Sequence, residues 1–246
     1  MDRERFLAAL QSYAGAERDP KGIGTLGERS VHAVLKAYFE PQEDNTEIKI
    51  GSFVADIAGE DGIIEIQTRA LYRLKKKLDC FLEYARVTVV HPVFSKKYLR
   101  WADPATGELS DRRLSPKKES IYTAMDELVG IKNYLDDPNF AFVCIVLECE
   151  DIRLLDGYSK DKKKGATKLD RYPLDIVAEY RFECPQDYMM LVPEEIEGEF
   201  ATSDFAKAAK ISRRLAQSTL NILSYTGCVK CIGKKNRENL YMITEI

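Results

Sequence analysis

The chain has 246 residues, of which 45% are hydrophobic and 31% are charged. That composition is typical of a globular protein, and the length suffices for one large core plus a small second domain. No apolar run approaches the roughly 20 residues that span a membrane, and Met1–Arg5 lacks the apolar stretch of a secretion signal. We therefore expect a cytoplasmic protein with no membrane partner.

The net charge of −3 averages over two basic segments. Residues 69–118 carry 13 Lys or Arg and 5 Asp or Glu, and residues 201–246 carry 8 and 3. Such segments are often plain solvated faces, yet two of them on an acidic remainder also suit a protein that meets phosphates on one side. The charge pattern leaves nucleic acid open as a partner.

Two helices are predicted first, from Asp2 to Tyr13 and from about Leu26 to Phe39, because apolar residues recur there at helical spacing. Glu28 falls at the start of the second helix, where Thr25-x-x-Glu28 forms a capping box that satisfies backbone donors. Glu28 could equally serve as an outer metal ligand or hold a water. Both roles are open at this point.

A β-hairpin is predicted next, with strands Ser52–Ala58 and Ile63–Thr68 joined by a Gly-Glu-Asp-Gly turn. Side chains alternate across a strand, so Glu65, Gln67 and Arg69 share one face. The hairpin could bring Asp56 beside Glu65, and two converging carboxylates next to an amide can hold a hard divalent cation. A solvated hairpin face is the alternative that spacing leaves open.

A helix over Ala70–Ala85 and a nearly continuous apolar strand over Arg86–Val93 are predicted after the hairpin. His91-Pro92, at the end of that strand, could reach the cleft or shape a turn, and the turn is favoured. Ser95–Glu119 is expected to form a basic hairpin or loop. Its cations interleave with Tyr98 and Trp101, which suits phosphate contact plus base stacking, although Trp101 could simply anchor the hairpin on the core. The candidate phosphate contacts are Lys96, Lys97, Arg100, Arg112 and Arg113.

The middle of the chain continues with a predicted helix over Ser120–Leu135 and a strand over Phe140–Glu148. Asp156–Arg171 is poor in apolar residues and is expected to be a surface loop. Two strands, Asp175–Glu183 and Asp187–Val192, are predicted after it.

Glu28, Asp56 and Glu65-Ile66-Gln67, on this order of helices and strands, resemble the signature of the PD-(D/E)XK nucleases: an Asp, a short gap, then Glu or Asp, any residue, and Lys. The resemblance covers roughly residues 20–150. It implies an α/β fold with a restriction-endonuclease-like mixed sheet flanked by helices. It also implies Mg²⁺ or Mn²⁺ held by Asp56, Glu65 and the backbone carbonyl of Ile66, with Glu28 assisting from the first core helix.

Two positions depart from that signature. Ala55 stands where proline is usual, which is a frequent variation in the superfamily. Gln67 stands in the Lys position, and an amide can hydrogen-bond the attacking water but cannot act as a base. Arg69, on the same predicted strand face, could supply the missing positive charge to the scissile phosphate. The catalytic residues implied are Glu28, Asp56, Glu65, Gln67 and Arg69.

The last segment, from Pro193, resembles a winged helix-turn-helix domain. A short helix over residues 202–210 and a longer one over 213–225 precede two strands, at 228–232 and 240–243, which flank a basic turn. We therefore divide the chain into a nuclease-like domain, residues 1–192, and a winged-helix domain, residues 193–246. Winged helices also serve as protein-binding modules.

In a winged helix the second helix can enter the major groove while the wing touches phosphate. The residues expected to contact DNA are Arg213, Arg214, Gln217 and Ser218 on the helix, with Lys234, Lys235 and Arg237 on the wing.

Two functions fit this sequence. In the first, the protein is a Mg²⁺-dependent endonuclease that its winged helix delivers to DNA. In the second, it is a catalytically inactive nuclease fold that binds DNA or acts as a regulator, with Gln67 marking the loss of cleavage. Cutting both strands at once requires two such sites, as a homodimer would supply.

Overall fold

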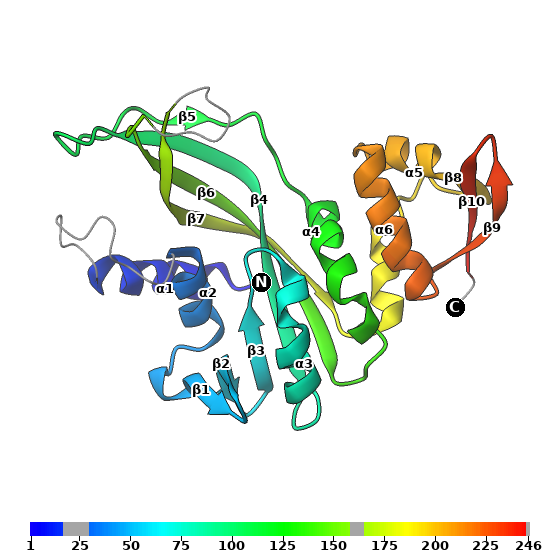
Figure 1. Ribbon diagram of the computed structural model, residues 1–246, viewed down its shortest axis with the longest axis horizontal. Coiled ribbons are helices and arrows are strands. Elements are labelled where there is room, and N and C mark those ends of the chain that lie inside the picture. The colour runs from blue at the N-terminus through cyan, green and yellow to red at the C-terminus, as the bar shows by residue number, and fades with distance from the viewer. Residues whose placement is uncertain (17–29, 158–164, 245–246) are drawn as a thin grey trace. The chain divides into compact units, whose positions relative to one another are not determined.

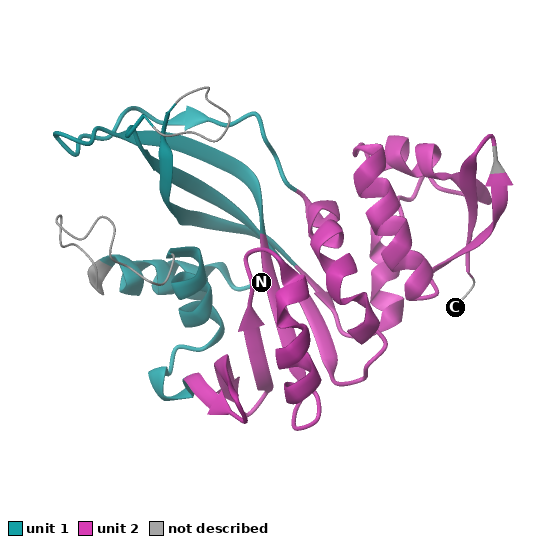
Figure 2. Cartoon of the chain, in the orientation of Figure 1, with its two compact units in different colours: residues 1–46, 93–119, 145–179 teal, residues 47–92, 120–144, 180–246 magenta. Residues whose placement is uncertain are grey.

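The structure is a computed structural model that describes residues 1–16, 30–157 and 165–244, apart from the side chains at positions 15, 16 and 235. Figure 1 labels its helices and strands. The chain divides into two compact units, coloured in Figure 2. Unit 1 comprises residues 1–46, 93–119 and 145–179, and unit 2 comprises residues 47–92, 120–144 and 180–246. The boundary predicted at residues 192–193 lies inside unit 2.

Within the described residues, seven strands form one mixed sheet of order β1-β2-β3-β4-β6-β7, with β5 paired to β4. β2 and β3 are antiparallel, whereas β3 and β4 are parallel. A mixed sheet accompanied by helices confirms the predicted α/β class. The strands are β1 (Thr46–Ile50), β2 (Phe53–Gly59), β3 (Gly62–Ile66), β4 (Val87–Ala102), β5 (Arg113–Leu114), β6 (Phe140–Leu154) and β7 (Thr167–Phe182).

β6 is the most apolar strand of the sheet. Its residues from Phe140 to Leu147 are all buried, without the alternation of a strand that has one wet face. β4 begins in the same way, since Val87, Val89 and Val90 are 0% exposed. Both strands were predicted, but each is longer than expected: β4 continues to Ala102 and β6 to Leu154.

Unit 1 contains the two N-terminal helices, α1 (Arg3–Ala16) and α2 (Ser30–Phe39), which pack against each other. Phe6, Val34 and Leu35 are fully buried, and the rings of Phe6 and Tyr38 meet edge to face at 5.9 Å. The predicted start of the second helix at Leu26 lies outside the described residues.

Unit 1 also contains the short 3₁₀ helix η1 (Glu43–Asn45), whereas unit 2 contains the other helices and a small sheet of order β8-β10-β9. In its C-terminal part, both predicted helices and both predicted strands are present, joined by the unpredicted β8. The helices are η2 (Leu71–Leu74), α3 (Lys75–Phe81), α4 (Ile121–Leu128), η3 (Val129–Tyr134), η4 (Pro185–Leu191), α5 (Thr202–Ala208) and α6 (Arg213–Tyr225), and the strands are β8 (Glu199–Ala201), β9 (Val229–Lys235) and β10 (Glu238–Ile243).

The prediction of a strand at Asp187–Val192 is wrong, because this segment lies in the 3₁₀ helix η4. Asp187 starts the helix by accepting the N–H groups of Glu183 and Cys184 at 2.7 and 3.0 Å. Tyr188 and Leu191 are the buried pair, at the i, i+3 spacing of a 3₁₀ turn. The run of five apolar residues from Tyr188 to Val192 does not by itself distinguish a strand from a helical turn.

The predicted turn at His91-Pro92 is also wrong, since β4 runs straight through both residues. Of the predicted loop at residues 156–171, residues 158–164 lie outside the described residues, and residues 167–171 belong to β7 instead. No helix among the described residues is long and apolar enough to cross a membrane.

Candidate functional site

Asp56 and Glu65 meet across the β2–β3 hairpin of unit 2. The antiparallel register pairs Ile57 with Ile64, so Asp56 falls opposite Glu65. The Asp56 N–H donates to Glu65 Oε1 at 3.3 Å, and the Ile66 N–H donates to Asp56 Oδ2 at 2.7 Å. The hairpin therefore brings the two predicted carboxylates together.

Lys77 of α3 is the cation at this pair. Its Nζ lies 3.0 Å from Glu65 Oε1 and 2.8 Å from Glu65 Oε2. Sequence reasoning assigned no role to Lys77 and missed this contact. One signal was present: Lys77 stands three residues after Leu74 and four before Phe81, both buried, so it borders the apolar stripe of the helix.

The Glu65 carboxyl is buried, with 2% of the residue exposed. Burial, and after it the charge of the neighbouring Asp56 carboxylate, together raise the pKa of Glu65 to about 7, against the opposing effect of Lys77. A further positive charge at this place would stabilise the ionised pair.

β3 stops beside this site because of Pro92. The parallel ladder with β4 runs as far as Gln67, whose N–H donates to the Val90 carbonyl at 2.9 Å. In a parallel ladder the next donor, to the Gln67 carbonyl, would be the N–H of residue 92, which proline lacks. His91 Nδ1 donates to that carbonyl instead, at 2.7 Å. Residues beyond Ile66 are thus released from the sheet.

Gln67 and Arg69 consequently do not follow the predicted strand alternation. The Gln67 side-chain amide donates to the Arg69 carbonyl at 2.6 Å, which curls the chain after the strand. Arg69 is exposed, and Ala70 follows it with a left-handed φ of 57°. The structure thus groups Asp56 and Glu65 with Lys77, while the Gln67 amide bonds to backbone.

The other predicted metal ligands are placed only in part. Glu28 lies outside the described residues, and Ile66 contributes its N–H to Asp56. Among the described residues, no group of three or more His, Cys, Asp or Glu side chains is placed to hold a metal ion. Proteins commonly bind Mg²⁺ through one or two carboxylates, with waters and substrate phosphates completing the octahedron. The Asp56–Glu65 donor pair fits that mode.

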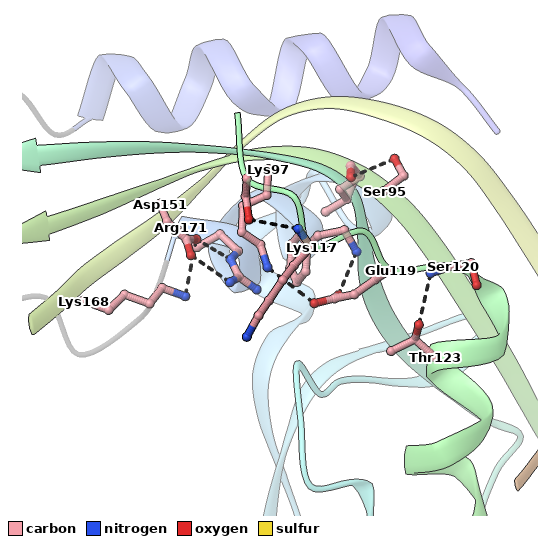
Figure 3. Close-up of polar contacts among 12 residues, drawn as sticks. Ser95, Lys97, Lys117, Glu119, Ser120, Thr123, Asp151, Lys168 and Arg171 are labelled. Carbon is pink, nitrogen blue, oxygen red and sulfur yellow. Dashed lines mark hydrogen bonds and ion pairs between the residues drawn. The ribbon is translucent and has the colours of Figure 1, made fainter. Parts of the chain in front are cut away.

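A second charged cluster lies in unit 1 and is drawn in Figure 3. The Arg171 guanidinium donates two hydrogen bonds to the Asp151 carboxylate, of 2.5 and 3.0 Å, and Lys168 Nζ lies 3.6 Å from the same carboxylate. Lys97, 7% exposed, lies 3.5 Å from Glu119. Lys97 was predicted to contact phosphate, but its ammonium is held inside this cluster.

The remaining predicted phosphate contacts are Lys96 and Arg100 of β4, Arg113 of β5 and Arg112 directly before β5. Lys96 pairs with Glu148 at 3.5 Å, and Arg112 pairs with Glu150 at 2.5 Å. Both cations lie over the ring of Tyr98, at 5.4 and 5.6 Å from its centre. Arg100 donates from Nε to the Ser110 carbonyl at 2.8 Å, and Arg113 is exposed on β5. The charges of Lys96 and Arg112 are thus already paired with carboxylates, whereas Arg113 is exposed.

α6 is engaged by its neighbours on two sides. Arg213 forms an ion pair with Glu238 of β10. Arg214 pairs with Asp126 of α4 at 2.5 Å, and Ser218 donates to the same carboxylate at 2.7 Å. Of the four residues expected to face DNA, two are therefore occupied by α4.

Gln217 is exposed on α6, and Lys234 and Arg237 are exposed at the β9–β10 turn. Arg237 has a left-handed φ of 69°. The side chain of Lys235 lies outside what the structure describes.

Comparison with known proteins identifies a family without identifying an activity. A family model described as "Domain of unknown function (DUF8091)" matches residues 29–183. The chain belongs to this family. The DUF8091 match includes the β2–β3 hairpin, α3 and the unit 1 cluster, and it ends before η4.

A relative of this DUF8091 protein is an uncharacterized protein from Treponema pallidum (strain Nichols). It is 27% identical over 221 residues, which cover 89% of this chain and 86% of the relative. The similarity therefore extends beyond the DUF8091 match. No solved structure matches the chain.

Proposed function

We propose that this protein is a metal-dependent nuclease that hydrolyses phosphodiester bonds of DNA. The observation that carries the proposal is the buried Glu65 carboxylate, opposed to Asp56 and bonded to Lys77. Carboxylates that lie close together and away from water repel each other when both are ionised. A cation bound between them offsets this repulsion. Strongly perturbed ionisable groups of this kind concentrate at functional sites.

The residues divide the chemistry as follows. Mg²⁺ or Mn²⁺ would supply a hydroxide-forming centre and stabilise charge on the phosphate. Asp56 and Glu65 would hold the ion. Lys77 would orient Glu65 and place a positive charge near the phosphate, which is the part that Gln67 and Arg69 were expected to play. A lysine on the neighbouring helix thus provides the cation that position 67 lacks.

We propose that the C-terminal segment contacts the DNA. The order β8-α5-α6-β9-β10, with sheet order β8-β10-β9, supports the winged-helix interpretation. Lys234 and Arg237 are exposed on its β-hairpin, where phosphate contact requires them. A homodimer would place two sites on the two strands.

The test is cleavage of supercoiled plasmid with Mg²⁺, with Mn²⁺ and with EDTA. Asp56→Asn and Glu65→Gln should each abolish cleavage while duplex binding persists. Lys77→Met should lower the cleavage rate by about 100-fold, the usual cost of losing one electrostatic contact to a transition state. Lys76→Met is the matched control, because Lys76 is the adjacent exposed lysine of α3.

Full activity in Lys77→Met would refute the assigned role of Lys77. Metal-independent cleavage, or cleavage that survives Asp56→Asn, would refute the metal centre.

A second function is favoured by one observation. Gln67 bonds to the Arg69 carbonyl and Lys77 already neutralises Glu65, so the site is satisfied without a substrate. The second proposal is therefore that the protein binds DNA without cutting it, as a regulator would. Binding of duplex without cleavage of duplex, branched or single-stranded substrates with either metal would favour it.

A further inference from the structure

A polar groove lies in unit 2 between α6 and the β9–β10 hairpin. Its volume is about 570 Å³, within the roughly 300 to 1,000 Å³ of ligand sites in proteins. α6 forms one wall and the hairpin the other, and Lys132 of η3 and Tyr225 contribute to the lining. Nothing in the cleavage chemistry uses this groove.

One face of α6 is directed to the groove. Arg213, Gln217, Asn221 and Ser224 recur every three or four residues, so they form one stripe along the helix, and all of them line the groove. The other sides of α6 are occupied: Leu223 is fully buried, and Arg214 bonds to α4. The polar stripe therefore faces the protein's own hairpin.

The groove carries an excess of positive charge. Its cations are Lys132, Arg213 and Arg237, and Glu238 is its acidic residue. Arg213 is neutralised by Glu238. Lys132 donates to the neutral Asn221 amide at 2.9 Å, and within the described part of the chain neither Lys132 nor Arg237 belongs to an ion pair. Lys132 and Arg237 therefore leave two positive charges in the groove that can bind an anion.

The uncharged groups of the groove suit a base. Gln217, Asn221 and Asn239 offer amides, each with two donors and an acceptor, as the edge of a nucleobase requires. Tyr225 lines the groove with a partly exposed aromatic ring, over which the Lys132 ammonium lies 5.6 Å from the ring centre. A base that stacks on this ring would therefore lie next to Lys132.

We propose that this groove binds one nucleotide unit, its phosphate paired with Lys132 and Arg237 and its base hydrogen-bonded by the amide side chains. The unit comes either from a free nucleotide or from a single strand, whose bases are accessible. A base pair within a duplex does not suit the groove, because its Watson–Crick edges are already hydrogen-bonded to each other and cannot meet the amide side chains. The inference goes beyond DNA cleavage, since it needs neither metal nor the hairpin carboxylates.

Cys231 provides the readout, because it is exposed and lines the groove. Alkylation of the full chain by N-ethylmaleimide is followed peptide by peptide in EDTA, with adenosine monophosphate, a short single-stranded oligonucleotide, or the same oligonucleotide annealed to its complement. At a ligand concentration about ten times Kd, binding should slow the modification of Cys231 about tenfold. Cys184 is exposed but does not line the groove, so its rate should stay constant.

The three probes distinguish a free nucleotide from a nucleotide within a single strand. Protection by the mononucleotide identifies a free nucleotide, and protection by the oligonucleotide alone identifies a strand. Protection by no probe, or equal protection by the duplex, overturns the proposal.

Two variants with the same change in charge complete the test. Gln217→Glu puts a carboxylate in the groove and should abolish protection of Cys231. Lys207→Gln removes a positive charge from an exposed site on α5 that does not line the groove, and it should leave protection unchanged. Thermal unfolding verifies that both variants fold. Undiminished protection in folded Gln217→Glu would show that the ligand binds elsewhere, and the proposal would fail.

Discussion

At position 92 the backbone of β4 has no N–H, and this one missing donor ends the β3–β4 ladder next to Glu65. The buried His91 ring replaces it at the Gln67 carbonyl, 2.7 Å away. A proline within a strand is usually confined to an edge or to a point where pairing stops, and here β3 stops. The chain after β3 is thereby free to curl into the Gln67–Arg69 contact.

His91→Phe should lower the free energy of unfolding by about 1 kcal/mol or more, because it leaves the Gln67 carbonyl without its side-chain donor. Pro92→Ala restores a backbone N–H that can reach the same carbonyl. His91→Phe should therefore cost less in the Pro92→Ala background. Urea unfolding of the two single variants and the double variant measures this coupling. Additive changes in the free energy of unfolding would contradict the inference that the His91 ring takes the place of the missing N–H at position 92.

Asp151 is the residue of unit 1 with the clearest link to pH. Burial raises the pKa of Asp151, but the hydrogen bonds and charge of Arg171, with the charges of Lys168 and Lys97, outweigh it, and the net pKa is lowered. A lowered folded-state pKa means that the unfolded chain binds the proton more tightly. The stabilisation is present above the unfolded pKa of about 4 and is lost as pH falls through the lower, folded value.

Asp151→Asn should destabilise the protein at pH 7 by about 3 kcal/mol, since it breaks a buried pair and leaves Arg171 without its counter-charge. It should also flatten the loss of stability below about pH 4. Urea unfolding between acidic and neutral pH checks both effects. Asp111→Asn, at an exposed site in the same unit, is the control. An unchanged acid slope in Asp151→Asn would rule out this carboxylate as its source.

Among the elements, the β2–β3 hairpin has the tightest geometric requirement. Gly62 follows the two-residue turn with a φ of +102°, and a Cβ there would lie 2.4 Å from the Arg86 carbonyl oxygen. That carbonyl accepts the Ile63 N–H at 2.8 Å, so it is held in the ladder and has little room to move. Glycine is required here both for its backbone conformation and for its lack of a side chain.

Gly62→Ala should therefore lower the melting temperature by more than Gly107→Ala. Gly107 also has a positive φ, +73°, but no atom lies within 4 Å of the position that a Cβ would occupy there. Both substitutions place alanine at a positive φ, which costs about 1 kcal/mol or more, and Gly62→Ala adds a φ further from the left-handed well and the clash with Arg86. Equal decreases in melting temperature for the two variants would show that the Arg86 carbonyl can move aside.

At the scale of the whole molecule, charge is distributed unevenly. The basic segments 69–118 and 201–246 lie on a chain whose net charge is −3. Many of these cations are paired within their own unit, as with Lys97 and Arg112. Exposed cations such as Arg113 and Lys234 are the ones available to phosphates.

Arg113→Gln and Lys234→Gln should each reduce the slope of log K against log salt by about 0.9, if each residue releases one counterion on duplex DNA. Binding is measured in EDTA so that no cleavage intervenes. Lys49→Gln, an exposed lysine of β1 outside the basic segments, should leave the slope unchanged. If neither Arg113→Gln nor Lys234→Gln changed the slope of log K against log salt, these residues would not contact the DNA.

The sequence by itself determined most elements and the pairing of Asp56 with Glu65. These are local properties: periodicity reports which side of a helix or strand is buried, and a two-residue turn sets the register of its own strands. The misjudged segment at residues 187–192 was short, and a run of a few apolar residues does not distinguish a strand from a helical turn.

Only the tertiary structure decided which charges meet. Lys77 lies 12 residues from Glu65, and Lys97 lies 22 from Glu119. No periodicity records such contacts, because they depend on how one element packs on another. For the same reason the face of α6 that remains exposed, and the groove it forms with the β9–β10 hairpin, follow from packing between segments rather than from the sequence of either.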